Sequence, residues 1–320
     1  MLRTRWYRAL VVIALALLVF GGGDACGAKY AGEAFTLGAG ARALALGGAY
    51  TALADDASGV YYNPAGLALV GRNELILLHS ETFGSLVNHD FVAYSRPAHL
   101  GKKTGSLALG IYRVGGGGIK LTDKDLQRGR TIVVREVSHY DYLFLIGGGF
   151  ALSSKLRAGL TAKVMARSYG DNSGYGLGLD FGLQYDALHS LRLALAAANV
   201  TSSFISYDNG TRESILPAFK LGARFHQGIA PFTILLAADG EILFEGRKES
   251  AQFWAGNLSV DTRYGVELGY YERVFFRAGS DIGKLSLGAG VKLGRFALDG
   301  AFLDHPDLDN SYRISLTIAF

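Results

Sequence analysis

A long apolar run is the feature that this 320-residue sequence most plainly lacks. The longest, residues 9–20, is shorter than the ~20 residues that a membrane-spanning helix needs. Charges or glycines interrupt every later apolar stretch, so the sequence predicts no transmembrane helix. Cysteine is equally scarce, and the single Cys26 excludes a disulfide within one chain.

Charged residues are also few, at 19% of the chain against ~25% in soluble domains. The formal net charge is +4. Removal of residues 1–28, which contain three arginines and one aspartate, leaves 29 basic and 27 acidic residues, or +2. This balance lacks the basic excess of a nucleic-acid-binding protein. The seven histidines are scattered without a pair at metal-ligand spacing, so we predict no metal site, and nothing predicts a cofactor.

The N-terminus has the three regions of a secretory signal peptide. Three arginines precede the apolar run, and small residues follow it. Cleavage is predicted after Ala25 or Ala28, which assigns residues 1–28 to the signal peptide and implies export.

Glycine and aromatic residues are abundant, with 44 glycines and 12% aromatics. Apolar residues alternate with small or polar ones, most clearly over residues 174–185. One face of that stretch is aliphatic between Tyr175 and Tyr185, and the other is glycine and polar. Glycine weakens an ordinary soluble strand. Apolar residues toward lipid, aromatics at both interfaces and small or polar residues toward the lumen are typical of a transmembrane barrel strand.

This period-two pattern recurs about fourteen times. The predicted strands are 73–80, 88–97, 104–113, 140–151, 155–167, 174–186, 190–199, 216–226, 231–240, 262–271, 274–280, 284–293, 295–303 and 311–320. Short connections alternate with mostly longer, polar outer loops, as in outer-membrane barrels. These loops are 114–139, 168–173, 200–215, 241–261 and 304–310. We therefore predict an all-β fold over residues 72–320, a transmembrane antiparallel β-barrel among the lipids of a bacterial outer membrane.

The final strand supports this prediction. Tyr312, Ile314, Leu316, Ile318 and the terminal Phe320 share one face. An alternating strand that ends in phenylalanine resembles the signal by which barrel insertion machinery recognises its clients, so this machinery is a predicted partner. In lipid the last strand must pair with the first, because an open edge leaves backbone groups unsatisfied. Enzymatic activity is not expected, because the lipid-facing positions offer no nucleophile–base pair.

Residues 29–71 break the alternation and are rich in alanine and glycine. Leu46 and Tyr50 are among the few bulky side chains, and Asp55 and Asp56 can supply turn or capping oxygens. Small residues let a folded segment pack inside a barrel lumen. We predict that residues 29–71 fold into the lumen as a hatch or plug.

Three motifs resemble those of a known superfamily. Residues 40–68 read GARALALGGAYTALADDASGVYYNPAGLA, which resembles the N-terminal motif of FadL-type transporters of hydrophobic compounds and, more closely, of their PorV/PorQ-type relatives. Residues 275–305, FFRAGSDIGKLSLGAGVKLGRFALDGAFLDH, and the closing RISL of 313–316 also resemble the PorV/PorQ branch. The resemblance implies a fourteen-stranded barrel with an N-terminal hatch. It matches the triplet Asn63, Pro64 and Ala65 to the plug signature of the family.

Two interpretations of this triplet stay open. Asn63 and Pro64 can shape a turn at a constriction that gates passage, or they can simply turn the chain of a static plug. By alternation, Arg157, Lys163 and Arg224 point into the lumen. They can pair with other lumenal charges, or they can bind the head of an anionic amphiphile. The predicted ligand site lies where the hatch meets this basic face, with an apolar cleft for the tail. Its residues are Asp55, Asp56, Asn63, Pro64, Ala65, Arg157, Lys163 and Arg224, and the cleft is lined by Leu44, Leu46, Tyr50 and Leu53.

Two functions follow from the sequence. The first is a transporter or channel for hydrophobic or amphipathic small molecules. The second is a non-conducting accessory of protein secretion or surface attachment, which would bind secretion-system proteins as PorV/PorQ-type relatives do. The predicted outer loops are moderate in length and charged, which favours transport slightly.

Overall fold

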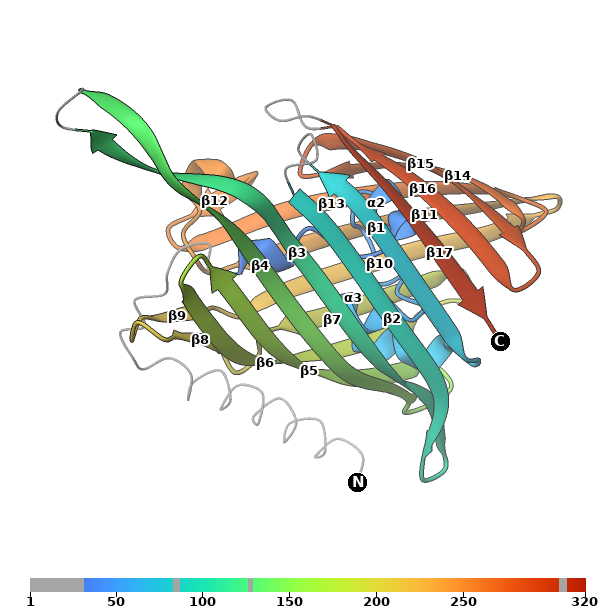
Figure 1. The fold of residues 1–320 in the computed structure, drawn as a ribbon. Helices are drawn as coiled ribbons and strands as arrows, with labels where there is room; N and C mark the ends of the chain where they lie inside the picture. Colours follow the sequence, from blue (N-terminus) through green and yellow to red (C-terminus); the bar gives the residue numbers. More distant parts are fainter. Residues whose placement is uncertain (1–31, 83–86, 126–128, 305–309) are drawn as a thin grey trace.

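The computed structural model describes residues 32–82, 87–125, 129–304 and 310–320 of the chain. The predicted signal peptide, residues 1–28, and the first residues of the predicted hatch lie outside this part. Among the described residues, fourteen antiparallel strands form a closed barrel (Figure 1). They are β1 (Glu74–Thr82), β2 (Val87–Leu100), β3 (Lys103–Asp125), β4 (Arg130–Ala151), β5 (Leu156–Tyr169), β6 (Asn172–Asp186), β7 (Leu191–Ala198), β10 (Ala218–Ile229), β11 (Phe232–Leu243), β13 (Leu258–Tyr270), β14 (Val274–Asp281), β15 (Lys284–Leu293), β16 (Phe296–Leu303) and β17 (Ser311–Ala319). The predicted fold class is confirmed.

The barrel closes where its last strand meets its first. β17 pairs with β1 in register, so that Leu75 lies opposite Ile318. The backbone N–H of Phe320 continues this ladder by donating to the Asn73 carbonyl at 2.9 Å. The Phe320 ring stacks on Tyr94 of β2, with ring centroids 6.3 Å apart. The expected pairing of the C-terminal strand with the strand near Leu75 is confirmed.

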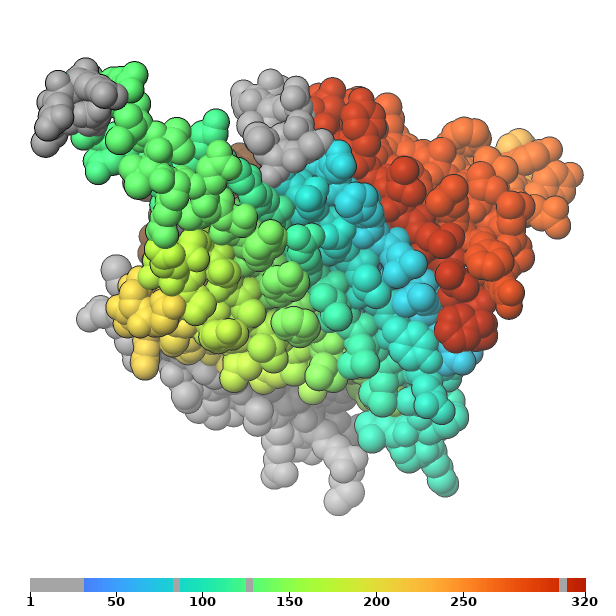
Figure 2. Space-filling view, in the orientation of Figure 1, coloured from blue at the N-terminus to red at the C-terminus, as the bar shows by residue number. Residues whose placement is uncertain are grey.

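The strands carry their apolar residues on the outside of the barrel. On β6, Tyr175 and Leu177 are 66% and 70% exposed, whereas the alternating Gly176 and Gly178 are buried. Figure 2 shows the outer surface of β1 to β5 as a continuous wall. An aliphatic outer face of this kind fits contact with lipid. Within the described part, none of the helices has the length and apolarity to cross a membrane.

β3 and β4 extend beyond the wall as a two-stranded ribbon, residues 116–125 and 130–138, which projects from one end of the molecule (Figures 1 and 2). The sequence prediction of an outer loop at 114–139 is therefore wrong. Its glycine run forms a bulge between Gly116 and Ile119, with Gly118 at a φ of +73°. Pairing then resumes with Ile119 opposite Val137. A bulge at glycine bends the strand without ending it, which the sequence alone does not distinguish from a loop.

Two other predicted loops contain short elements. Residues 200–215 include β8 (Ser203–Tyr207) and β9 (Arg212–Ile215). β8 pairs with residues 174–177, near the start of β6. Residues 241–261 include η3 (Lys248–Ser250) and β12 (Phe253–Ala255). These elements lie at the end of the barrel opposite to the start of β1 and the end of β17. We call the end of the barrel where β1 starts and β17 ends the short-turn end, and we call the opposite end the loop end.

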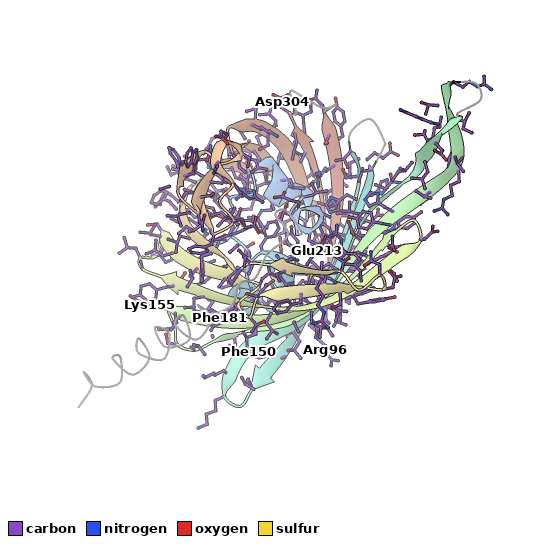
Figure 3. The ribbon with its side chains drawn as sticks, turned by 90° about the vertical axis from the view of Figure 1, so that its left-hand side faces the viewer. Arg96, Phe150, Lys155, Phe181, Glu213 and Asp304 are labelled. Carbon is purple, nitrogen blue, oxygen red and sulfur yellow. The ribbon has the colours of Figure 1, made fainter. Side chains whose placement is uncertain are left out.

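Residues 32–73, here called the lumenal segment, precede β1 and lie inside the ring of strands (Figures 1 and 3). The segment contains η1 (Glu33–Phe35), α2 (Ala41–Ala45), α3 (Gly59–Tyr62) and η2 (Pro64–Leu69). Its alanines, leucines and tyrosines pack with inward-facing residues of the wall in one buried core. The helices are short because glycine, Asn63 and Pro64 punctuate this stretch.

Candidate functional site

The lumenal segment touches the barrel wall where inward-facing positions are glycine. A Cβ atom at Gly159 of β5 would lie 2.4 Å from the Pro64 carbonyl oxygen, and one at Gly149 of β4 would lie 2.0 Å from the same atom. At Gly182 of β6 a Cβ would lie 2.0 Å from the Asn63 side-chain oxygen. Three neighbouring strands therefore form a glycine surface on which the Asn63-Pro64 turn rests.

Asn63 holds this turn from both sides. Its Nδ2 donates to the Thr51 carbonyl at 2.9 Å and to the Leu183 carbonyl of β6 at 3.3 Å. Its Oδ1 accepts from the Ala65 N–H at 3.1 Å and caps η2. Asn63 is fully buried. Pro64 at the first position of η2 has no N–H to satisfy.

A second contact surface lies on the opposite wall. Gly265, Gly279 and Gly288 of β13, β14 and β15 face the backbone of Leu46 and the Ala45 side chain, where a Cβ would lie between 2.2 and 2.8 Å from segment atoms. The lumenal segment is thus wedged between two glycine surfaces.

The aspartates next to this core form an ionic network with Arg42 of α2. The Arg42 guanidinium donates to Asp55 at 2.8 Å, to the Tyr50 hydroxyl at 3.2 Å and to Glu267 of β13 at 3.4 Å. The Tyr50 hydroxyl donates to Asp56 at 2.6 Å. The network therefore joins the predicted residues Tyr50, Asp55 and Asp56 to the wall through an arginine that the sequence reasoning did not single out.

The two adjacent aspartates have opposite pKa shifts. Burial acts to raise the pKa of Asp55, but the charge and hydrogen bond of Arg42 outweigh it, and the pKa lies below its ordinary value. Burial and then the negative charge of Asp55 raise the pKa of Asp56. The pair therefore resembles a fixed anion beside a readily protonated neighbour.

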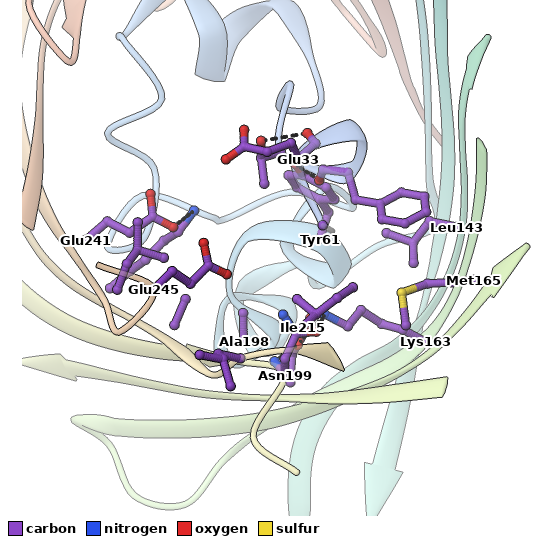
Figure 4. Close-up of a pocket in the computed structure, with 18 of the residues that line it drawn as sticks. Glu33, Tyr61, Leu143, Lys163, Met165, Ala198, Asn199, Ile215, Glu241 and Glu245 are labelled. Carbon is purple, nitrogen blue, oxygen red and sulfur yellow. Dashed lines mark hydrogen bonds and ion pairs between the residues drawn. The ribbon is translucent and has the colours of Figure 1, made fainter. Parts of the chain in front are cut away.

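A first cavity, the outer cavity, lies between the lumenal segment and the wall toward the loop end (Figure 4). Its volume is about 120 Å³. Its apolar lining comes from the segment, from inward-facing wall residues and from the end of β9: Phe35, Tyr61, Leu143, Leu145, Met165, Ile215, Leu216, Ala218 and Leu243. The charged side chains at its edge form ion pairs, namely Lys163–Asp180 at 2.7 Å, Lys220–Glu241 at 3.3 Å and Arg247–Glu245 at 3.4 Å.

Two further cavities lie toward the short-turn end and are polar. One, here called the arginine cavity, has a volume of about 470 Å³ and is lined by Asp55, Leu69, Val70, Gly71, Arg72, Glu74, Arg192 and Arg224. The other, of about 290 Å³, has the Arg42 network and the Arg277–Asp299 pair in its lining. Asp55 lines both cavities.

The structure divides the predicted ligand-binding residues between these places. Asp55 and Arg224 meet in the arginine cavity, whereas Lys163 lies in the outer cavity. Arg157 pairs with Asp186 at the short-turn end. Asn63, Pro64 and Ala65 are buried where the lumenal segment contacts the wall. They line neither cavity that contains Lys163 or Arg224.

The predicted apolar cleft is filled by packing. Leu46 and Leu53 are fully buried in the core, and Leu44 is nearly so. The apolar space lies instead beside Phe35 and Tyr61. Periodicity could have marked Leu143, Leu145 and Met165 as inward-facing apolar exceptions on otherwise small or polar lumenal faces.

Part of this chain is similar to a known protein family. A family model described as Uncharacterised protein family (UPF0164) matches residues 20–106. No curated protein matches the sequence.

Three solved structures of channels are similar. The CymD monoaromatic hydrocarbon channel has a TM-score of 0.53 at 12% identity, over 89% of this chain and 98% of that one. The toluene transporter TodX of Pseudomonas putida has a TM-score of 0.51 at 12% identity, over 88% and 97%. A TodX deltaS2S3 mutant has 0.53 at 11%, over 88% and 98%. At these identities the likeness shows a shared fold. The resemblance to the PorV/PorQ branch stays a prediction.

Proposed function

We propose that this protein is an outer-membrane channel for hydrophobic or amphipathic small molecules. The outer cavity carries the proposal, because an apolar space of about 120 Å³ approaches the roughly 150 Å³ that accommodates one benzene ring in an engineered protein cavity. Each charged side chain in its lining has an ion-pair partner, with Glu33 and Glu245 sharing Arg247, so a neutral ring meets no unpaired ion there. The fold shared with monoaromatic hydrocarbon channels supports the same substrate class.

The lumenal segment is the proposed hatch. The outer cavity lies on its loop-end side and the arginine cavity on its short-turn side. A molecule that crosses the lumen must therefore pass this segment, and passage requires the segment to shift on its glycine surfaces. Residues 1–28 are the proposed signal peptide, and residues 72–320 the barrel.

The proposal is tested by filling the outer cavity. Ala218 of β10 lines it and is almost fully buried, so Ala218→Phe should occupy the space of a one-ring ligand. Cells that express the variant are expected to take up toluene at a rate at least about tenfold lower than cells with the parent protein. A tenfold decrease corresponds to ~1.4 kcal/mol. Ala289→Phe on the exposed outer face of β15 is the matched control and should leave uptake unchanged. Equal uptake by both variants and the parent would contradict the channel.

One observation favours the alternative of a non-conducting accessory in protein secretion or surface attachment. The ribbon of residues 116–125 and 130–138 exposes aliphatic side chains such as Val133 and Val134, and it extends beyond its neighbours in the wall. Unpaired strand edges are ready templates for another chain. If the accessory function holds, replacing residues 119–137 by a short turn should abolish a complex with a secreted protein, while Ala218→Phe leaves that complex intact.

A further inference from the structure

Four charged residues form a row across neighbouring strands near the short-turn end. They are Arg157 of β5, Asp186 of β6, Arg192 of β7 and Arg224 of β10, all on the lumenal face. Asp186 lies directly opposite Arg192, and Arg192 directly opposite Arg224. The row therefore has three cations and one anion. Like charges that face each other across two strands are destabilising unless something lies between them.

The one carboxylate of the row is already shared. Asp186 accepts from the Nη2 of Arg157 and, at 2.7 Å, from the Nε of Arg192. Arg224 forms no ion pair with any residue of the described part. The row thus has an excess of two positive charges, and Arg224 is the member without a counterion.

Two donor atoms of the row are buried without an acceptor. They are the Nη1 of Arg157 and the Nε of Arg224. A buried donor without a partner costs free energy, and the cost is larger for a charged group. Such atoms on two arginines of one row indicate that an acceptor from outside the chain completes the cluster.

The space for this acceptor is present. Arg192 and Arg224 line the arginine cavity, together with Arg72. The two carboxylates in its lining have partners of their own. Asp55 is bound by Arg42 at 2.8 Å, and Glu74 by Arg72 at 2.9 Å.

We propose that an oxyanion, a carboxylate or a phosphate group, binds in the arginine cavity between Arg192 and Arg224. The guanidinium fork matches both groups, because each presents two oxygens in the plane that two N–H groups require. The site differs from the outer cavity, where the lining charges are paired. It also does not require passage through the barrel, so it stands or falls separately from the proposed channel.

Isothermal titration of the purified barrel in zwitterionic micelles tests the site. Inorganic phosphate and benzoate are the probes, and benzamide is the uncharged match for benzoate. We expect both anions to bind and benzamide not to bind. Arg224→Gln should weaken anion binding about tenfold or more, the loss of one charge-assisted hydrogen bond. Arg135→Gln removes an exposed arginine that pairs with Asp171 at the loop end, and should leave binding unchanged.

A second variant guards against a folding defect. Arg224→Lys keeps the charge but lacks the planar donor fork, so it should bind the anions with intermediate affinity. Folding of each variant is checked by its gel migration with and without heating. Anion binding that is the same in the parent, Arg224→Gln and Arg224→Lys would overturn the proposal.

The anion can be a soluble solute or a lipid headgroup, and nanodiscs distinguish the two. Native mass spectrometry of the barrel in discs with phosphatidylglycerol should show a retained lipid in the parent and not in Arg224→Gln, if the headgroup is the ligand. Binding of phosphate or benzoate without lipid retention identifies a solute. If neither lipid nor soluble anion binds in an Arg224-dependent way, the site does not exist. Toluene uptake that survives in that case would leave the channel proposal intact.

Discussion

Asp55 and Asp56 show how neighbouring residues of one type acquire different chemistry. Asp55 is held ionised by its ion pair with Arg42, whereas buried Asp56 accepts from the Tyr50 hydroxyl and from Ser58 and forms no ion pair with a residue of the described part. An acid whose pKa is lowered in the folded state stabilises that state above its ordinary pKa. An acid whose pKa is raised has the opposite effect, because the folded state binds the extra proton.

This difference predicts a pH dependence. As pH rises from the ordinary aspartate value of 3.8 through the raised pKa of Asp56, stability should fall, because ionised Asp56 is disfavoured in the folded state. Below 3.8, stability should fall as Asp55 becomes protonated and loses Arg42. Asp56→Asn is expected to reduce the first limb and keep the second. Thermal unfolding midpoints in micelles from about pH 3 to neutral pH measure both limbs, and an unchanged profile in Asp56→Asn would count against this assignment.

Asn63 offers a test at a single hydrogen-bonding side chain. Asn63→Ala removes the donor to Thr51 and the cap of η2. We expect a loss of about 1–3 kcal/mol in the stability of the docked segment, because the buried Ala65 N–H loses its acceptor and the Thr51 carbonyl keeps only the longer bond from Gln184, at 3.3 Å. A cysteine at Val60, which is fully buried, reports on docking by its labelling rate in the native barrel. Faster labelling in Asn63→Ala is the expected result, and equal rates would show that the turn holds without this side chain.

At the scale of elements, the lumenal segment is positioned by the missing side chains of inward-facing glycines on the strands. Glycine at inward-facing positions of β4, β5 and β6 lets backbone approach backbone, and the same holds for β13, β14 and β15. Glycine has a cost in a strand. Here the cost is offset by the close contact that it allows, so these strands and the lumenal segment form one packed unit.

A methyl group at this contact should displace the segment. In Gly159→Ala the new Cβ must move Pro64, and overpacking of this kind costs about 1–3 kcal/mol. We expect faster labelling of the Val60 cysteine and a greater leak of small solutes through the barrel in liposomes. Gly300→Ala on β16 is the matched control, since a Cβ there meets no atom within 4 Å. A leak of equal size in both variants would argue that the segment does not seal the lumen.

At the scale of the whole molecule, closure of the barrel depends on one seam, β17 against β1. Closure leaves no strand edge exposed to lipid, where unpaired backbone groups are costly. The unheated protein is therefore expected to migrate differently from the heated protein on a gel, with a circular dichroism spectrum typical of β-structure. Leu316→Pro, opposite Leu77 in the seam, should abolish the shift because proline removes a ladder N–H. Leu316→Ala keeps that N–H and should retain the shift.

The sequence by itself determined the wall of this protein. Period-two alternation is local, and in a barrel each strand meets the same two environments, lipid outside and lumen inside. The strand count, the seam between β17 and β1 and the outward aliphatic face were therefore predictable. The continuation of β3 and β4 into the ribbon was not, because a glycine bulge and a glycine loop have the same composition.

Only the tertiary structure decided what lies inside. Which inward-facing side chains meet depends on the curvature of the wall and on the path of the lumenal segment, and neither is local in sequence. Lys163 and Arg224 share a predicted face, yet the first pairs with Asp180 in the outer cavity and the second lines the arginine cavity. Leu46, which the sequence assigned to a cleft, became core because glycines far along the chain let it reach the wall, and Leu53 is buried in the same core. Packing against distant residues, and not residue type, separated the space for a ligand from the filled interior.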